Sequence, residues 1–173
     1  ENGGENTQGK RYFAKVLWGG LLKSRKSAAL PGAKIYPPTL TNSDLANIKI
    51  AKEMGVTGVM QPFVRDHSDL ECVKEALREA GAEDIRLFAK IENMDGVRKL
   101  EKLLPAADEI VIARGDLGNA VHLWDLPGVQ RQISEKCRAA GKPFMVVTQM
   151  LASMERSPVP TRAEVNDIFH AVM

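Results

Sequence analysis

Charged residues close two apolar stretches of this sequence at positions where they could act together. Lys90 and Glu92 end the first stretch, residues 86 to 92, and alternate positions of a strand point to the same face. The second stretch, residues 109 to 114, leads directly into Asp116. A cation and two carboxylates thus reach the ends of two successive strands, where α/β proteins usually carry their chemistry. The pattern indicates an active site.

These charges favour a small divalent cation and an anionic substrate. Glu92 and Asp116 can converge on Mg²⁺ or Mn²⁺, because such an ion takes one or two carboxylates and fills its other positions with water and substrate oxygens. Lys90 stays protonated beside them and can neutralise charge on a phosphoryl group or an enolate. Gly115 lets the backbone approach a ligand, and Thr148, at the end of a later strand, can direct its hydroxyl to the same spot.

Each of these residues also has a purely structural interpretation. Lys90 and Glu92 can form an ion pair at the rim of a barrel, Asp116 can shape a turn, and Thr148 can bond to backbone at a strand end. We favour the functional interpretation because all four come to strand ends. The three histidines lack the spacing of metal ligands and are interpreted as structural: His67, His122 and His170.

A regular β–α alternation from residue 38 onward positions these side chains. Strands are predicted at about 57–64, 86–92, 109–114 and 144–148. Helices are predicted at about 43–54, at 94–105, and from Trp124 to Cys137. Two capping boxes, Ser68-x-x-Glu71 and Thr161-x-x-Glu164, predict the starts of two more. The strand exits recur at intervals close to the roughly 31 residues per unit of a (β/α)8 barrel.

The predicted fold class is therefore α/β, a partial TIM (β/α)8 barrel with about four of its eight strands. A doubly wound Rossmann-type sheet is the alternative, although the sequence has no GxGxxG fingerprint. Half a barrel leaves two open sheet edges, so the chain alone is expected to be poorly stable or to seek a partner. Because it opens on Glu1 and stops at Met173 within an amphipathic helix, we expect a fragment of a longer protein.

The composition argues against several classes of partner. The 173 residues are 44% hydrophobic and 27% charged, as in ordinary globular proteins. The net charge of +2 gives no reason to expect nucleic acid or an anionic membrane. No apolar run approaches the roughly 20 residues that cross a bilayer, and no signal peptide is recognisable, so a cytoplasmic location is expected. Cys72 and Cys137 form no CxxC pair and are interpreted as reduced thiols.

Five motifs, in order and spacing, resemble the pyruvate kinase family. They are Lys-Ile-Glu-Asn at 90–93, Ala-Arg-Gly-Asp-Leu-Gly at 113–118, Gly-Lys-Pro at 141–143, Thr-Gln-Met-Leu-Ala-Ser-Met at 148–154 and Pro-Thr-Arg-Ala-Glu at 160–164. The resemblance covers about residues 19 to 173. It implies a catalytic barrel over residues 19–173, preceded by the end of an inserted β lid domain over residues 1–18, with its last strand at 11–18.

The resemblance also implies roles for single residues. Lys90 would stabilise the transferring phosphoryl group and the enolate, and Glu92 and Asp116 would bind the divalent metal. Gly115, Asp116 and Thr148 would hold phosphoenolpyruvate, and Thr148 matches a threonine implicated in protonating enolpyruvate. The implied glycolytic reaction transfers phosphoryl from phosphoenolpyruvate to ADP, giving pyruvate and ATP, with Mg²⁺ or Mn²⁺. The full-length enzyme would be a homotetramer that also uses K⁺, whose ligands lie outside this sequence.

Three positions depart from the family pattern around the pocket. Pro62 stands where the family commonly has serine, Asn119-Ala120 where an acidic residue is usual, and Met94-Asp95 where His-Glu or Gln-Glu is typical. Two other functions therefore stay open. One is a metal-dependent aldolase or lyase acting on a pyruvate enolate, and the other is a catalytically degenerate relative that only binds the metabolite.

Overall fold

The computed structural model describes residues 15–24 and 37–173. The chain divides into two units, residues 1–38 and 39–173, which are considered separately. In the first unit, residues 15–24 form no helix or strand. The strand predicted at 11–18 is therefore wrong over residues 15–18, and its beginning lies outside the described residues. The predicted division into a lid, 1–18, and a barrel, 19–173, stays a prediction.

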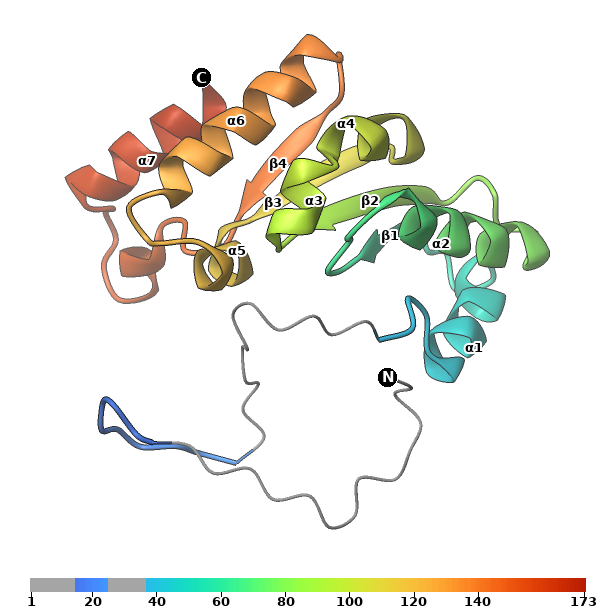
Figure 1. Cartoon of the computed structure of the whole chain (residues 1–173), viewed down its shortest axis with the longest axis horizontal. Helices are drawn as coiled ribbons and strands as arrows, with labels where there is room; N and C mark the ends of the chain where they lie inside the picture. Colours follow the sequence, from blue (N-terminus) through green and yellow to red (C-terminus); the bar gives the residue numbers. More distant parts are fainter. Residues whose placement is uncertain (1–14, 25–36) are drawn as a thin grey trace. The chain divides into compact units, whose positions relative to one another are not determined.

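The second unit is a parallel sheet flanked by helices (Figure 1). Its strands are β1 (Gly58–Gln61), β2 (Arg86–Ile91), β3 (Glu109–Ala113) and β4 (Phe144–Val147), paired in that order and all parallel. The helices are α1 (Asn42–Ala51), α2 (His67–Glu79), α3 (Met94–Arg98), α4 (Leu100–Leu103), η1 (Leu104–Ala106), α5 (Arg114–Ala120), α6 (Leu126–Ala139), η2 (Ala152–Glu155) and α7 (Arg162–Val172). The α/β class and the four parallel strands are confirmed.

The hydrophobic core lies between the helices and one face of the sheet. Alternate residues of β2, namely Leu87, Ala89 and Ile91, are at most 2% exposed, and so are Ile110 and Ile112 of β3. Figure 1 shows α3, α4 and α6 over one face of the sheet. The helices contribute these buried side chains to the same core: Leu70, Val73, Leu77, Val97, Leu100, Leu103, Ile133 and Cys137.

The opposite face of the sheet is less covered. The register pairs Met60 with Phe88 and Lys90 with Val111, so these four side chains share that face. Met60 is 46% exposed, although Val111 is fully buried. In a closed barrel this face would line the interior. The two faces therefore differ in function: one carries the core and the other carries Lys90.

Helix α2 begins earlier than the sequence predicted. Its N-cap is Asp66, whose side chain accepts from the Ser68 N–H at 2.8 Å, and Asp69 completes the capping box. The predicted box of Ser68 and Glu71 is wrong, because aspartate caps a helix as well as serine does and this one comes first. The box of Thr161 and Glu164 at the start of α7 is confirmed.

Three further elements end or begin away from their predicted limits. β1 stops at Gln61 instead of about residue 64, because Pro62 has no N–H to donate and Phe63 has a φ of +50°. The helix predicted at 94–105 is interrupted at Lys99, where ψ is 10°. The helix predicted from Trp124 begins at Leu126, and Trp124 stacks instead on His122 with a ring separation of 4.8 Å.

Both cysteines are free thiols, with Cys72 exposed and Cys137 buried. Within residues 15–24 and 37–173, no helix has the length and apolar character needed to span a membrane.

Candidate active site

The site is built on Lys90 and Glu92 at the end of β2. The Lys90 ammonium lies 2.7 Å from Glu92 Oε1, and the side chain of Glu92 is only 1% exposed. This is the ion pair that the structural interpretation expected, but it is buried at the strand end and does not lie on an exposed rim. A carboxylate so far from water needs cationic or hydrogen-bonding neighbours.

The other carboxylate oxygen of Glu92 is held by backbone from the neighbouring strand exit. The Phe63 N–H donates to Glu92 Oε2 at 2.7 Å. Phe63 has a left-handed backbone, with a φ of +50°, and the residue is 58% exposed. A bulky residue at positive φ is rare and persists where its surroundings hold it. The loop after β1 is therefore shaped around Glu92.

Asp116 approaches Glu92 from the end of β3. Asp116 stands in the first turn of helix α5, which begins at Arg114 directly after the strand. Burial raises the pKa of Glu92, and a hydrogen-bonded contact with the Asp116 carboxyl raises it further; Lys90 and the Phe63 N–H act in the opposite direction. The structure thus brings Lys90, Glu92 and Asp116 together, as the sequence predicted.

Thr148 joins the cluster from the end of β4. The Gly115 N–H donates to its hydroxyl oxygen at 2.9 Å, so the hydroxyl proton remains available as a donor. The backbone of Thr148 has a φ of +77°, an unusual conformation for a β-branched residue. The backbone bond expected by the structural interpretation is present, and it links Thr148 to the same turn as Asp116.

Arg114 holds this part of the site together, a role that sequence reasoning missed. Its guanidinium donates to the Thr148 carbonyl at 2.9 Å and to Asp167 Oδ1 of α7 at 2.5 Å, and its side chain is 10% exposed. Phe63 was missed as well, because a backbone N–H has no sequence signature. The sequence signal for Arg114 was its position directly after an apolar strand.

The residues present fit a divalent cation of the Mg²⁺ type. Glu92 Oε1 is buried and faces the Lys90 ammonium, and burial raises the pKa of Glu92, so its charged form would gain from a further cation. The described residues contain no group of three or more His, Cys, Asp and Glu side chains arranged for a metal. A pair of carboxylates suits Mg²⁺, which takes most other ligands from water and substrate.

The fold and the site together define a class: a domain of the (β/α)-barrel type with its charged cluster at the carboxyl ends of the strands. A sequence model described as pyruvate kinase, barrel domain, matches residues 4–173. The chain belongs to the pyruvate kinase family.

Individual relatives agree with this assignment. The chain is 39% identical to a pyruvate kinase of Bacillus licheniformis over 96% of its own length and 28% of the relative. It is 41% identical to one of Geobacillus stearothermophilus over 95% of the chain and 28% of the relative. For one of Dictyostelium discoideum the identity is 40%, over 88% of the chain and 30% of the relative. The chain thus spans less than a third of these curated relatives.

Proposed function

We propose that this chain is the phosphoenolpyruvate and metal-binding part of a pyruvate kinase. The longer enzyme would transfer phosphoryl from phosphoenolpyruvate to ADP, giving pyruvate and ATP. The observation that carries the proposal is the meeting of Lys90, Glu92 and Asp116 at two neighbouring strand ends. The relatives described above are all named pyruvate kinase, which favours this reaction over an aldolase or lyase.

Each residue has a chemical role in the proposed reaction. Lys90 would neutralise charge on the transferring phosphoryl group and on the enolate. Gly115, Asp116 and Thr148 would bind phosphoenolpyruvate, and the hydroxyl of Thr148, which already accepts from Gly115 N–H, would direct a proton toward the enolate. Such catalysis depends mainly on positioning and electrostatics.

Glu92 and Asp116 would hold Mg²⁺ or Mn²⁺. A divalent ion there supplies charge stabilisation for phosphoryl transfer. By the same family likeness we propose that the complete enzyme also uses K⁺, forms a homotetramer and works in the cytoplasm, and that residues 1–18 belong to its lid domain and 19–173 to its barrel.

The test is an assay of the longer enzyme that contains this chain, with Mg²⁺, phosphoenolpyruvate and ADP. ATP formation is the expected result. Cleavage of a pyruvate enolate without need of ADP would support the aldolase or lyase instead, and binding without turnover would support a degenerate relative.

The role of Lys90 is tested by Lys90→Met in the same enzyme. We expect kcat to fall by about 10²–10³, the usual effect of removing one group that stabilises transition-state charge, while Mn²⁺ binding persists. Lys52→Met is the matched control, because Lys52 is 58% exposed and pairs with Asp84 and the Gly81 carbonyl on the surface. An unchanged kcat in Lys90→Met would show that Lys90 does not stabilise the transition state.

A further inference from the structure

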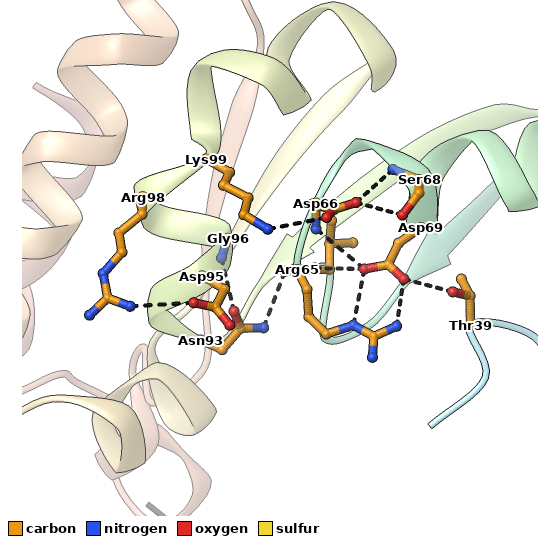
Figure 2. A network of polar contacts seen from close by, with 11 residues as sticks. Thr39, Arg65, Asp66, Ser68, Asp69, Asn93, Asp95, Gly96, Arg98 and Lys99 are labelled. Atoms are coloured by element: carbon orange, nitrogen blue, oxygen red, sulfur yellow. Dashed lines mark hydrogen bonds and ion pairs between the residues drawn. The ribbon is translucent and has the colours of Figure 1, made fainter. Parts of the chain in front are cut away.

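The loop that follows β1 carries the Phe63 N–H to Glu92, and it is held by polar contacts from several elements. Figure 2 shows the network, which runs from Thr39 through Arg65 and Asp69 to the start of α3 at Asn93 and Gly96. On the α2 side, Asp69 is 4% exposed and accepts from the Arg65 N–H at 2.8 Å and from the Arg65 guanidinium at 2.7 Å. The loop is thus anchored to α2 beyond Phe63.

Asn93 anchors the same loop from the other side. Its Nδ2 donates to the Val64 carbonyl at 3.1 Å, and its Oδ1 accepts from the Gly96 N–H at 2.9 Å. Asn93 is the residue directly after Glu92 and the N-cap of α3. One side chain therefore ties the chain segment of Glu92 to the residue directly after Phe63.

The fit between this loop and α3 is close. A Cβ atom at Gly96 would come within 2.7 Å of the Val64 carbonyl oxygen, which is nearer than real contacts of this kind. The Val64 N–H also donates to the Lys90 carbonyl at 3.3 Å. The peptide units on either side of Val64 are consequently held by Lys90 and by Asn93, the residue after Glu92, which leaves the left-handed Phe63 little freedom to turn its N–H away.

We propose that Asn93 is a positioning residue for Glu92. By holding the Val64 carbonyl it keeps the Phe63 N–H on Glu92 Oε2, so that Oε1 is the oxygen presented to Lys90 and to a divalent cation. The inference rests on the proposed metal-binding role of Glu92. Partners of this kind orient metal ligands, and their loss typically lowers metal affinity 10- to 100-fold.

Two substitutions distinguish the contributions of the two Asn93 hydrogen bonds. Asn93→Asp retains an oxygen that can cap the Gly96 N–H but loses the donor to the Val64 carbonyl, whereas Asn93→Ala loses both bonds. Thr41→Ala is the control, because the Thr41 side chain is the N-cap of α1 and its hydrogen bonds are with Asp44. Circular dichroism of each variant gives the folded fraction, to which the binding data are normalised.

Two measurements are made on the longer enzyme that contains this chain. The first is the NMR shift of the Phe63 amide proton, which moves to low field when it is bonded to a carboxylate. The second is Mn²⁺ affinity by electron paramagnetic resonance. We expect Asn93→Asp and Asn93→Ala to shift the Phe63 amide upfield and to weaken Mn²⁺ binding by about 10-fold or more, and Thr41→Ala to change neither.

The inference is overturned if Asn93→Asp leaves the Phe63 amide in place, or if Mn²⁺ binding falls no further than in Thr41→Ala. Failure of the proposed function has a different signature. If the unsubstituted protein binds no Mn²⁺ or makes no ATP, the kinase proposal fails, while the Phe63 resonance still decides whether Asn93 positions Glu92.

Discussion

The close packing around Gly96 predicts that adding a side chain there destabilises the protein. Gly96→Ala would bring a methyl group against the Val64 carbonyl oxygen, a backbone atom that cannot swing aside. Forcing an extra carbon into such a contact costs about 1–3 kcal/mol. Urea denaturation followed by circular dichroism should show this loss of unfolding free energy.

Gly128→Ala is the matched comparison at the residue scale. Gly128 lies in α6, and a Cβ there would meet nothing within 4 Å. Alanine is the better helix former, so this change should stabilise the protein by about 0.5–1 kcal/mol. Equal changes in unfolding free energy for Gly96→Ala and Gly128→Ala would contradict a close contact between the Val64 carbonyl and α3.

Side chains were predictable from the sequence at this scale, and backbone roles were not. Lys90, Glu92 and Asp116 could be found because their charges follow apolar strands at an alternating spacing. The Phe63 N–H could not, since its position depends on one left-handed φ angle. Arg114 was visible as a charge, but its partner Asp167 lies 53 positions away, and no local pattern joins the two.

At the scale of elements, the connection from η2 to α7 has a predictable pH dependence. The Ser153 hydroxyl and N–H and the Thr161 N–H donate to Glu164 and lower its pKa to about 2. The ordinary pKa is near 4.5, so the ionised carboxylate adds stability above that pH and loses it as the pH falls toward 2. Glu164→Gln should therefore be less stable than the unsubstituted protein at pH 6, with a difference that shrinks between pH 4.5 and 2.

Thermal unfolding at a series of pH values measures this difference. Glu155→Gln is the control, because Glu155 is an exposed carboxylate of the same connection. A constant gap between Glu164→Gln and the unsubstituted protein across the acid range would contradict the role of the hydrogen bonds.

A part-buried ion pair between Arg114 and Asp167 attaches helix α7 to the site. Asp167→Ala would leave the guanidinium of Arg114 without its carboxylate, at a loss of about 1–3 kcal/mol in unfolding free energy. Glu101→Ala breaks the exposed pair with Lys136, and we expect little change. Chemical denaturation compares the two; an equal response would show that the Arg114 pair acts as an ordinary surface contact.

The four strands of the sheet were predicted in number, but the helices were fewer in the prediction than in the described residues, and the limits of several elements differed. The four strands and the capping box of α7 follow from apolar runs and cap residues. The start of α2 was misplaced because Asp66 and Ser68 are both good caps, and only the folded loop decides between them. The break at Lys99 has no Gly or Pro at that position to announce it, and buried side chains continue on both sides of it, at Val97 of α3 and Leu100 of α4.

For the whole molecule, we predict that the 173-residue chain alone has negligible kinase turnover. The site described here supplies a lysine, two carboxylates and Thr148, whereas the chain spans only 28% of the length of two kinases to which it is similar. A coupled assay of ATP formation on the purified chain measures this, and turnover comparable to that of a full-length relative would contradict it.

Whether the sheet closes into a barrel was predicted only indirectly from the sequence. The recurring spacing of strand exits indicated a barrel, and the parallel order β1 to β4 agrees with it. Four strands cannot by themselves close a barrel. Met60, on the same face of the sheet as Lys90, is partly exposed because no further strands among the described residues cover that face.

The order of the strands has a consequence for how the chain folds. Strands adjacent in the sheet are also consecutive in the sequence, so the contacts that build the sheet form between neighbouring segments. Parallel pairings span a crossover helix and form more slowly than hairpin contacts, but during synthesis the N-terminal segments emerge first. β2 can therefore dock on β1 before β3 has left the ribosome, and each new strand extends the structure at the edge left by the one before. The edge of β4 is thus the growing end of the assembly.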